Sequence, residues 1–175
     1  MRKAAVVAAV VVGLCLSTAC SKGSSITKAQ YVATADQVCA ASAKEVGGLL
    51  SEFIRKETTR DASSTERYVR FVLIKHLRAT INTLTTIPAP AGDGTYLGSM
   101  YADYAHSLAI RYSDPLGDSA DESEAAAENR FATYGMKKCS TMSADAAVSA
   151  DTQLAKARDE AAADKAKSKD PQAKG

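Results

Sequence analysis

The sequence predicts an all-α protein, and two features of its pattern indicate this fold class. Apolar residues recur every three or four positions over long segments, which is the spacing of one face of a helix. The pattern of β-strands, sustained apolar–polar alternation between tight turns, is absent from the sequence. Short connections between the segments favour antiparallel neighbours. We therefore expect an antiparallel up-down-up-down four-helix bundle with an Ala/Lys-rich C-terminal tail that is helical or disordered.

Residues that start and stop helices set the expected boundaries. We expect helices over residues 28–57, 64–87, 95–113 and 120–134. Three of these helices begin at a capping box, a motif in which two side chains accept hydrogen bonds from backbone amides that have no partner within the first turn. The three capping boxes are Thr27-x-x-Gln30, Ser63-x-x-Glu66 and Ser119-x-x-Glu122. Asp93 is the candidate N-cap of the third helix. Pro88 ends the second helix because proline cannot continue it, and Gly135 is placed to end the fourth.

Each of the first three helices has one apolar face. These faces consist of Tyr31, Ala35, Val38, Ser42, Val46, Leu49 and Phe53 in the first helix; Phe71, Ile74, Leu77, Ile81 and Leu84 in the second; and Leu97, Tyr101, Tyr104, Leu108 and Tyr112 in the third. The pair Gly47-Gly48 costs the first helix about 1 kcal/mol per glycine relative to alanine, and it is a candidate site for a kink.

The composition changes after the fourth helix. From Thr141 onward the chain is mostly Ala, Lys, Asp and Glu, and its largest aliphatic residues are Val148 and Leu154. Alanine permits a helix, but this segment offers no apolar face to bury. We expect a marginal fifth helix over about 144–166 that frays into a disordered end. The helical domain is therefore assigned to residues 27–140 and the tail to residues 141–175.

The N-terminus has the pattern of a bacterial lipoprotein signal. Arg2 and Lys3 precede an apolar run from Ala4 to Leu16, and small residues then lead to Cys20. Thirteen apolar residues are too few to span a bilayer, which needs roughly 20. We expect residues 1–19 to be a signal peptide that is removed, and Cys20 to carry palmitate or a similar chain. The alternative is an ordinary secretory signal that leaves Cys20 as a free thiol.

Residues 20–26 would then be the lipidated cysteine and a short linker. Removal of residues 1–19 takes two of the 22 basic residues and leaves 20 basic against 20 acidic ones. A nucleic-acid-binding protein usually has a basic excess, so a nucleic-acid partner is not expected. The expected location is the extracytoplasmic face of the cell membrane.

The remaining cysteines are expected to form a disulfide. Cys15 leaves with the signal and Cys20 takes the lipid, which leaves Cys39 and Cys139. Paired cysteines outside the cytoplasm usually form a disulfide. Metal binding is the alternative, although neither cysteine has a Cys or His neighbour at ligand spacing. No metal and no cofactor is expected.

Three motifs occur in a fixed order along the chain. They are Lys28-x-x-Tyr31-x-x-x-Ala35-Asp36-x-x-Cys39, Ile87-Pro88-Ala89-Pro90-Ala91-Gly92-Asp93 and Ala132-x-Tyr134-Gly135-Met136-x-x-Cys139. With this combination the sequence resembles a group of small secreted proteins and lipoproteins of actinobacteria, predicted to be helical and without a characterised function. The resemblance covers about residues 27–140. It implies the paired cysteines and a high-GC Gram-positive source, and it supplies no active site.

The polar side chains give no catalytic constellation. Asp103 and His106 are three residues apart on one helix face, but a di-metal bundle needs such pairs on two helices and further glutamates. His76 lies beside the apolar stripe of the second helix, and a haem-attachment motif is missing from the sequence. We expect both histidines to be ordinary boundary or solvated residues, so no catalytic residue is assigned.

Charge is distributed unevenly along the chain. Residues 55–78 contain seven basic and three acidic residues, whereas residues 114–128 contain six acidic residues and no base. Complementary solvated faces of one bundle would explain this distribution, and so would docking of a charged partner. The candidate partner surface consists of Arg55, Arg67, Arg70, Arg78, Asp118, Asp121 and Glu124.

Together these features predict a non-catalytic, lipid-anchored helical module that serves as an interaction or accessory protein. Its expected partners are the membrane, through the lipid, and a protein of the cell envelope. One alternative is a small-ligand-binding lipoprotein serving a transporter, with a cavity lined by Tyr101 and Tyr104. An envelope hydrolase is a further alternative, and it would need a carboxylate pair in a cleft.

Overall fold

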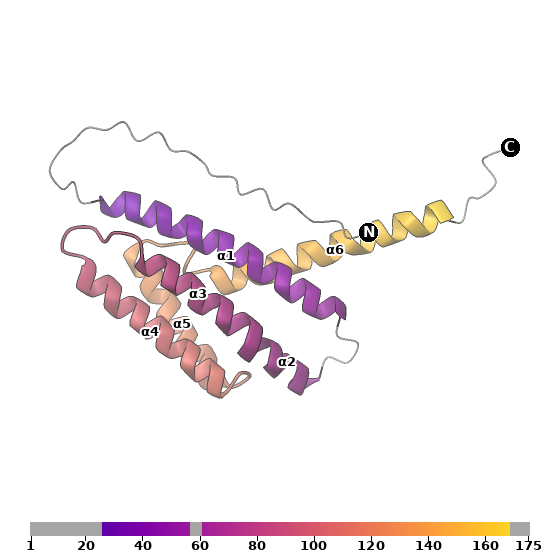
Figure 1. The fold of residues 1–175 in the computed structure, drawn as a ribbon, viewed down its shortest axis with the longest axis horizontal. Helices are drawn as coiled ribbons and strands as arrows, with labels where there is room; N and C mark the ends of the chain where they lie inside the picture. Colours follow the sequence, from indigo (N-terminus) through magenta and orange to yellow (C-terminus); the bar gives the residue numbers. More distant parts are fainter. Residues whose placement is uncertain (1–25, 57–60, 169–175) are drawn as a thin grey trace, which may run out of the picture.

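The computed structural model describes residues 26–56 and 61–168 and confirms the all-α prediction. Strands are absent from these residues. The helices are α1 (Lys28–Lys56), α2 (Ala62–Tyr68), η1 (Val69–Leu73), α3 (Ile74–Thr85), α4 (Gly94–Ser113), α5 (Asp118–Tyr134) and α6 (Met142–Ser168). Because α2, η1 and α3 follow one another without a break, the described residues form five packed helical segments (Figure 1). The predicted signal peptide, Cys20 and the linker up to Ser25 lie outside the described residues.

The start of α1 confirms one of the three capping boxes. The amide of Gln30 donates to Thr27 Oγ1 at 3.2 Å, and the amide of Thr27 donates to Gln30 Oε1 at 2.9 Å. This reciprocal pair satisfies two amides that the first turn leaves without partners within the helix.

The other two capping boxes do not form as predicted. In α2 the N-cap is Asp61 rather than Ser63, and its carboxylate accepts from the amide of Ser64 at 2.7 Å. A carboxylate two residues earlier thus takes the capping role, and the helix begins before the predicted box. The N-cap of α5 is Gly117 rather than Ser119, without a side-chain cap bond.

The expected residues mark the start of α4 and the end of α5. Asp93 is the N-cap of α4, but its side chain accepts from the Tyr134 hydroxyl at 2.5 Å instead of capping the helix. Gly135 ends α5 with a φ of 107°. In that left-handed conformation the amide of Met136 reaches the carbonyl of Phe131 at 2.9 Å, which is the closing bond of a Schellman motif.

A π-helical turn, η1, interrupts the second helical segment and changes which residues face inward. A π turn adds one residue relative to an α-helix. Val69 and Ile74 are buried five positions apart, whereas Phe71 is 61% exposed. The placement of Phe71 in the buried face was therefore wrong, because an uninterrupted α-helical period was assumed. The remaining members of that face, Ile74, Leu77, Ile81 and Leu84, are buried.

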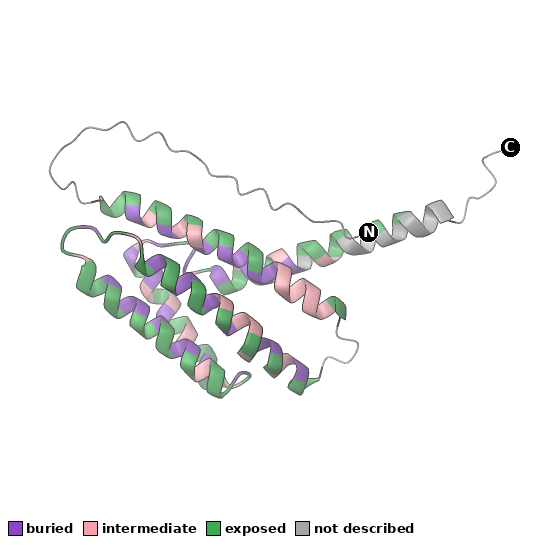
Figure 2. Cartoon of the chain, viewed as in Figure 1, coloured by how far each residue is buried: buried purple, intermediate pink, exposed green. Residues whose placement is uncertain are grey.

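The core lies where the inward faces of the helices meet (Figure 2). Large side chains with less than 2% exposure fill it, among them Tyr31, Tyr104, Phe131, Met100 and Leu108. Two polar pairs cross between helices inside it. Tyr31 and Tyr101 share a hydroxyl–hydroxyl bond, and Ser42 Oγ lies 2.7 Å from Thr80 Oγ1. Such paired hydroxyls avoid the cost of burying an unsatisfied polar group.

α6 packs against α1, although we expected no buried face in this segment. Its first turns bury Met142, Ala146 and Ala150, each at most 4% exposed. Small side chains facing Gly47 of α1 let the two helices approach closely, so burial here needs no bulky residue. The remainder of α6 extends past the other helices (Figure 1). Because five segments pack together, the up-down order of a four-helix bundle stays a prediction.

Candidate functional site

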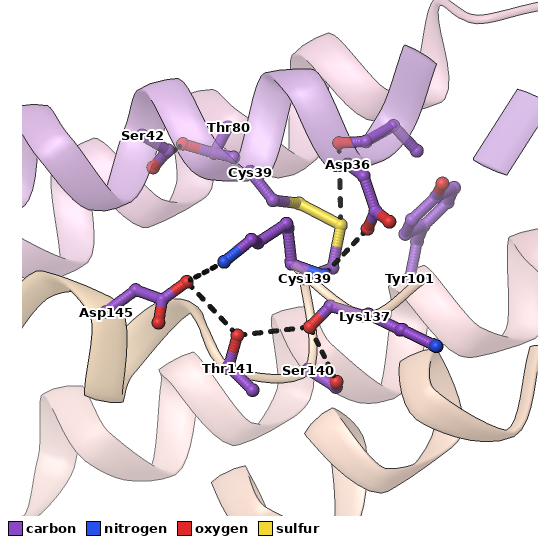
Figure 3. Close-up of a disulfide and its surroundings, with 12 residues drawn as sticks. Asp36, Cys39, Ser42, Thr80, Tyr101, Lys137, Cys139, Ser140, Thr141 and Asp145 are labelled. Atoms are coloured by element: carbon purple, nitrogen blue, oxygen red, sulfur yellow. Dashed lines mark hydrogen bonds and ion pairs between the residues drawn. A yellow bond between two sulfur atoms is a disulfide. The ribbon is translucent and has the colours of Figure 1, made fainter. Parts of the chain in front are cut away.

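The predicted disulfide between Cys39 and Cys139 is present, and it attaches the connection between α5 and α6 to α1 (Figure 3). Both cysteines are fully buried, with Cα atoms 5.0 Å apart. The same connection is bound to α1 by the amide of Lys138, which donates to Asp36 Oδ1 at 2.8 Å. Because α6 begins three residues after Cys139, these contacts fix where α6 starts against α1.

The exposed side of the second helical segment carries a compact group of basic and aromatic side chains. We call it the cationic–aromatic face, and it consists of Arg67, Arg70, Phe71 and Arg78 of the second segment with Tyr112 of α4. η1 turns Phe71 outward, and this ring packs edge-on against the ring of Tyr112, with centroids 6.4 Å apart. Tyr112 is itself 40% exposed, so two aromatic rings meet at the surface.

Two guanidinium groups complete this face. The guanidinium carbons of Arg70 and Arg78 lie 5.9 and 5.8 Å from the centre of the Tyr112 ring, within cation–π range. Arg70 also approaches Glu66 at 3.7 Å and donates to the carbonyl of Ser113 at 3.4 Å. Arg70 therefore helps to join η1 to α4, whereas Arg67 and Arg78 are exposed.

Two acidic residues of the candidate partner surface form ion pairs within the fold. Asp121 and Glu124 of α5 both pair with Arg111 of α4, the second at 3.0 Å. Burial alone would lower the pKa of Arg111, but the two carboxylates reverse this effect and raise its pKa above the usual value. The Glu124 side chain is only 15% exposed, so it mainly joins α4 to α5.

Two further residues of the candidate partner surface are exposed at helix ends. Asp118 is exposed at the first position of α5, and Arg55 is exposed in the last turn of α1. Neither belongs to the cationic–aromatic face. Sequence reasoning found its three arginines from the charge count, but it missed Phe71 and Tyr112 because both were assigned to buried stripes. Their ring contact depends on η1, which the spacing of apolar residues alone does not reveal.

His76 is half-buried, and His106 is exposed. His76 Nε2 lies 3.4 Å from Glu45 Oε2 of α1. Asp103 forms an ion pair with Arg130 of α5, and His106 lines the same shallow surface pocket. Within the described part of the chain, no group of three His, Cys, Asp or Glu side chains could hold a metal ion.

The tyrosines of α4 do not share a cavity. Tyr104 is fully buried, and Tyr101 lines a small pocket of about 140 Å³ together with Tyr31. Burial raises the pKa of Tyr101 well above its usual value, and the bond to Tyr31 adds to this effect. A larger pocket lies elsewhere, lined by all five helical segments and by the connection between α4 and α5.

Comparison with known proteins gives no relative: no family model, curated protein or solved structure matches the chain. None of the described helices is both long and apolar enough to cross a membrane.

Proposed function

We propose that this protein is a lipid-anchored, non-catalytic interaction module at the outer face of the cell membrane, and that its cationic–aromatic face binds a protein partner. The observation that carries this proposal is the exposed contact between Phe71 and Tyr112, with Arg70 and Arg78 against the same tyrosine. A few residues supply most of the binding energy at a protein interface, and tyrosine and arginine are enriched among them. Phenylalanine is also enriched at interfaces. The exposed ring of Phe71 beside these arginines therefore favours the interpretation that this face binds a partner, rather than being an ordinary solvent-exposed helix surface.

The charges of the face indicate the chemistry of its partner. Arg67, Arg70 and Arg78 are accompanied by Glu66, which already approaches Arg70. The cationic–aromatic face therefore has a net positive charge. We expect its partner to present carboxylates around an apolar pocket that accepts the side chain of Phe71. Opposite charges at the rim would increase the association rate and favour this partner over others.

The length of α1 supports a binding face away from the membrane. Its 29 residues span about 43 Å at 1.5 Å per residue. Seven residues separate Cys20 from the start of α1, and they reach at most about 25 Å. With the up-down order expected for the first four helices, the anchor and α2 lie at opposite ends of the domain. The face would then be available to a neighbouring envelope protein.

Site-specific photocrosslinking in living cells tests this proposal. Phe71 is replaced by benzoylphenylalanine in the full chain, and the matched control carries the same probe at Val148, which is 66% exposed on α6. We expect one abundant crosslinked protein from position 71 that is absent from position 148. Equal crosslinking from the two positions, or none from position 71, would contradict the assignment of this face.

A further inference from the structure

A second site, separate from the cationic–aromatic face, lies in an apolar pocket of the described structure. It has a volume of about 360 Å³, within the range of about 300–1,000 Å³ usual for small-molecule sites. Its walls come from all five helical segments and from the connection between α4 and α5. It is lined mainly by apolar side chains, among them Val46, Leu50, Phe53, Leu77, Leu116 and Met142. The lining changes from Met142, 1% exposed, to Leu116, 49% exposed. The pocket therefore runs from the buried core to the surface.

Tyr68 lines the pocket and has an unsatisfied polar group. The residue is 7% exposed, and its ring stacks on Phe53 with centroids 4.6 Å apart. Its hydroxyl is buried and has no hydrogen-bond partner within the described part of the chain. Burial raises the pKa of Tyr68 to about 12, so the hydroxyl keeps its proton. A buried hydroxyl without a partner costs about 1–3 kcal/mol, and a ligand oxygen in the pocket would remove this cost.

The charged groups at the pocket are already paired with each other. Glu124 Oε2 accepts from Arg111 at 3.0 Å, and Glu124 Oε1 accepts from Ser143 of α6 at 2.8 Å. Asp121 also pairs with Arg111, and Glu128 accepts from Ser143 at 2.9 Å. Two carboxylates thus pair with one guanidinium, and a third lies beside Ser143. This excess of negative charge disfavours a carboxylate or phosphate on the ligand.

We infer that the pocket binds a neutral, largely apolar lipid-like molecule with a single hydroxyl or carbonyl oxygen, which pairs with the hydroxyl of Tyr68. The apolar lining takes an alkyl or isoprenoid chain, and the paired Arg111 and Glu124 side chains require no compensating charge from the ligand. The site does not depend on the cationic–aromatic face, so either assignment can fail without the other.

The test uses the full chain in cells and two photoreactive probes. The first is hexadecanol with a diazirine on its alkyl chain, and the second is the matched hexadecanoic acid. Labelled peptides are identified by mass spectrometry after ultraviolet irradiation. We expect the alcohol to label residues that line the pocket and the acid to label them less. Preferential labelling by the acid, or labelling spread evenly over the chain, would overturn the inference.

Two variants tie the labelling to the pocket. Ala147 lines the pocket from an exposed position on α6, so Ala147→Phe narrows the pocket without entering the core, and Ala144→Phe is the matched control outside it. We expect Ala147→Phe alone to abolish labelling. Tyr68→Phe keeps the ring and removes the hydroxyl, so it should weaken labelling by the alcohol about 2–10-fold. Full labelling of both Ala147→Phe and Tyr68→Phe would exclude this pocket as the site.

Discussion

Gly47 of α1 faces Ser149 of α6 so closely that a Cβ atom at Gly47 would lie 2.5 Å from the Cβ of Ser149. It would also lie 2.8 Å from the carbonyl oxygen of Ala146. A backbone neighbour at this distance cannot rotate away, so the absence of a side chain at Gly47 permits the contact between the two helices. At Gly48 the nearest atom would be 3.6 Å away, an ordinary contact with the side chain of Gln153.

The two adjacent glycines should therefore respond to alanine in opposite directions. Gly47→Ala is expected to destabilise the protein by about 1–3 kcal/mol, the usual cost of overpacking. Gly48→Ala should stabilise it by up to about 1 kcal/mol, because alanine is favoured over glycine inside a helix. Thermal unfolding of both variants tests this. Equal shifts in the same direction would mean that α6 does not pack on α1 through Gly47.

The disulfide predicts a measurable loss of stability on reduction. The bond closes a sequence separation of 100 residues, worth at most about 4.7 kcal/mol in the chain-entropy model. Cys39→Ser should lower the melting temperature as much as dithiothreitol lowers that of the natural chain, and dithiothreitol should not affect the variant further. An unchanged melting temperature of the natural chain under reducing conditions would contradict a stabilising bond.

The rotation of Phe71 by η1 can be tested by a pair of alanine substitutions. Phe71→Ala should change the free energy of unfolding by no more than about 0.5 kcal/mol, as is usual for exposed sites. Phe131→Ala should cost about 3–5 kcal/mol because Phe131 is fully buried. Chemical denaturation measures both. If Phe71→Ala lowered the free energy of unfolding as much as Phe131→Ala does, Phe71 would have to be buried in the core, contrary to this account.

Glu128 should make stability depend on pH. Burial raises its pKa above the ordinary 4.5, Ser143 opposes this by donating a hydrogen bond, and the nearby charge of Glu124 raises the pKa further. A raised pKa in the folded state means that the fold binds this proton more tightly than the unfolded chain does. The resulting stability is present below the ordinary pKa and is lost as pH rises through the raised pKa.

Glu128→Gln removes this ionisation. It should raise the melting temperature near pH 7, and the gain should diminish towards about pH 4 as the natural side chain becomes protonated. Glu122→Gln, at an exposed position of α5, is the matched control and should change stability by no more than about 0.5 kcal/mol at either pH. Melting curves at both pH values decide the matter. A gain that is equal at the two values would exclude Glu128 ionisation as its cause.

Local signals predicted most of the helices and the cysteine pair. Thr27 with Gln30 and the isolated Gly135 mark helix ends by chemistry that a few neighbouring residues determine. The predictions were wrong where burial depends on contacts between residues that are far apart in the sequence. The buried face of α6 consists of small residues whose burial depends on Gly47, about 100 positions away in the chain.

The candidate site was predicted only in part for the same reason. The charge count between residues 55 and 78 identified Arg67, Arg70 and Arg78, because charge is a property of composition. The charge count could not show that the π-helical turn η1, which adds one residue to a helical turn, directs Phe71 towards Tyr112. Likewise, the acidic segment was correctly recognised as charged, but the pairing of Glu124 with Arg111 depends on how α4 packs on α5.

The most direct measurement of the proposed function is partner recovery after charge reversal on the cationic–aromatic face. The test variant carries Arg67→Glu and Arg78→Glu, and the control carries Lys44→Glu and Lys137→Glu, so the change in net charge is the same. All four positions are exposed. Both proteins are crosslinked in cells and purified from solubilised membranes. The account predicts that partner recovery falls about tenfold or more in the test variant alone, with unchanged melting. Equal recovery from both variants would contradict it.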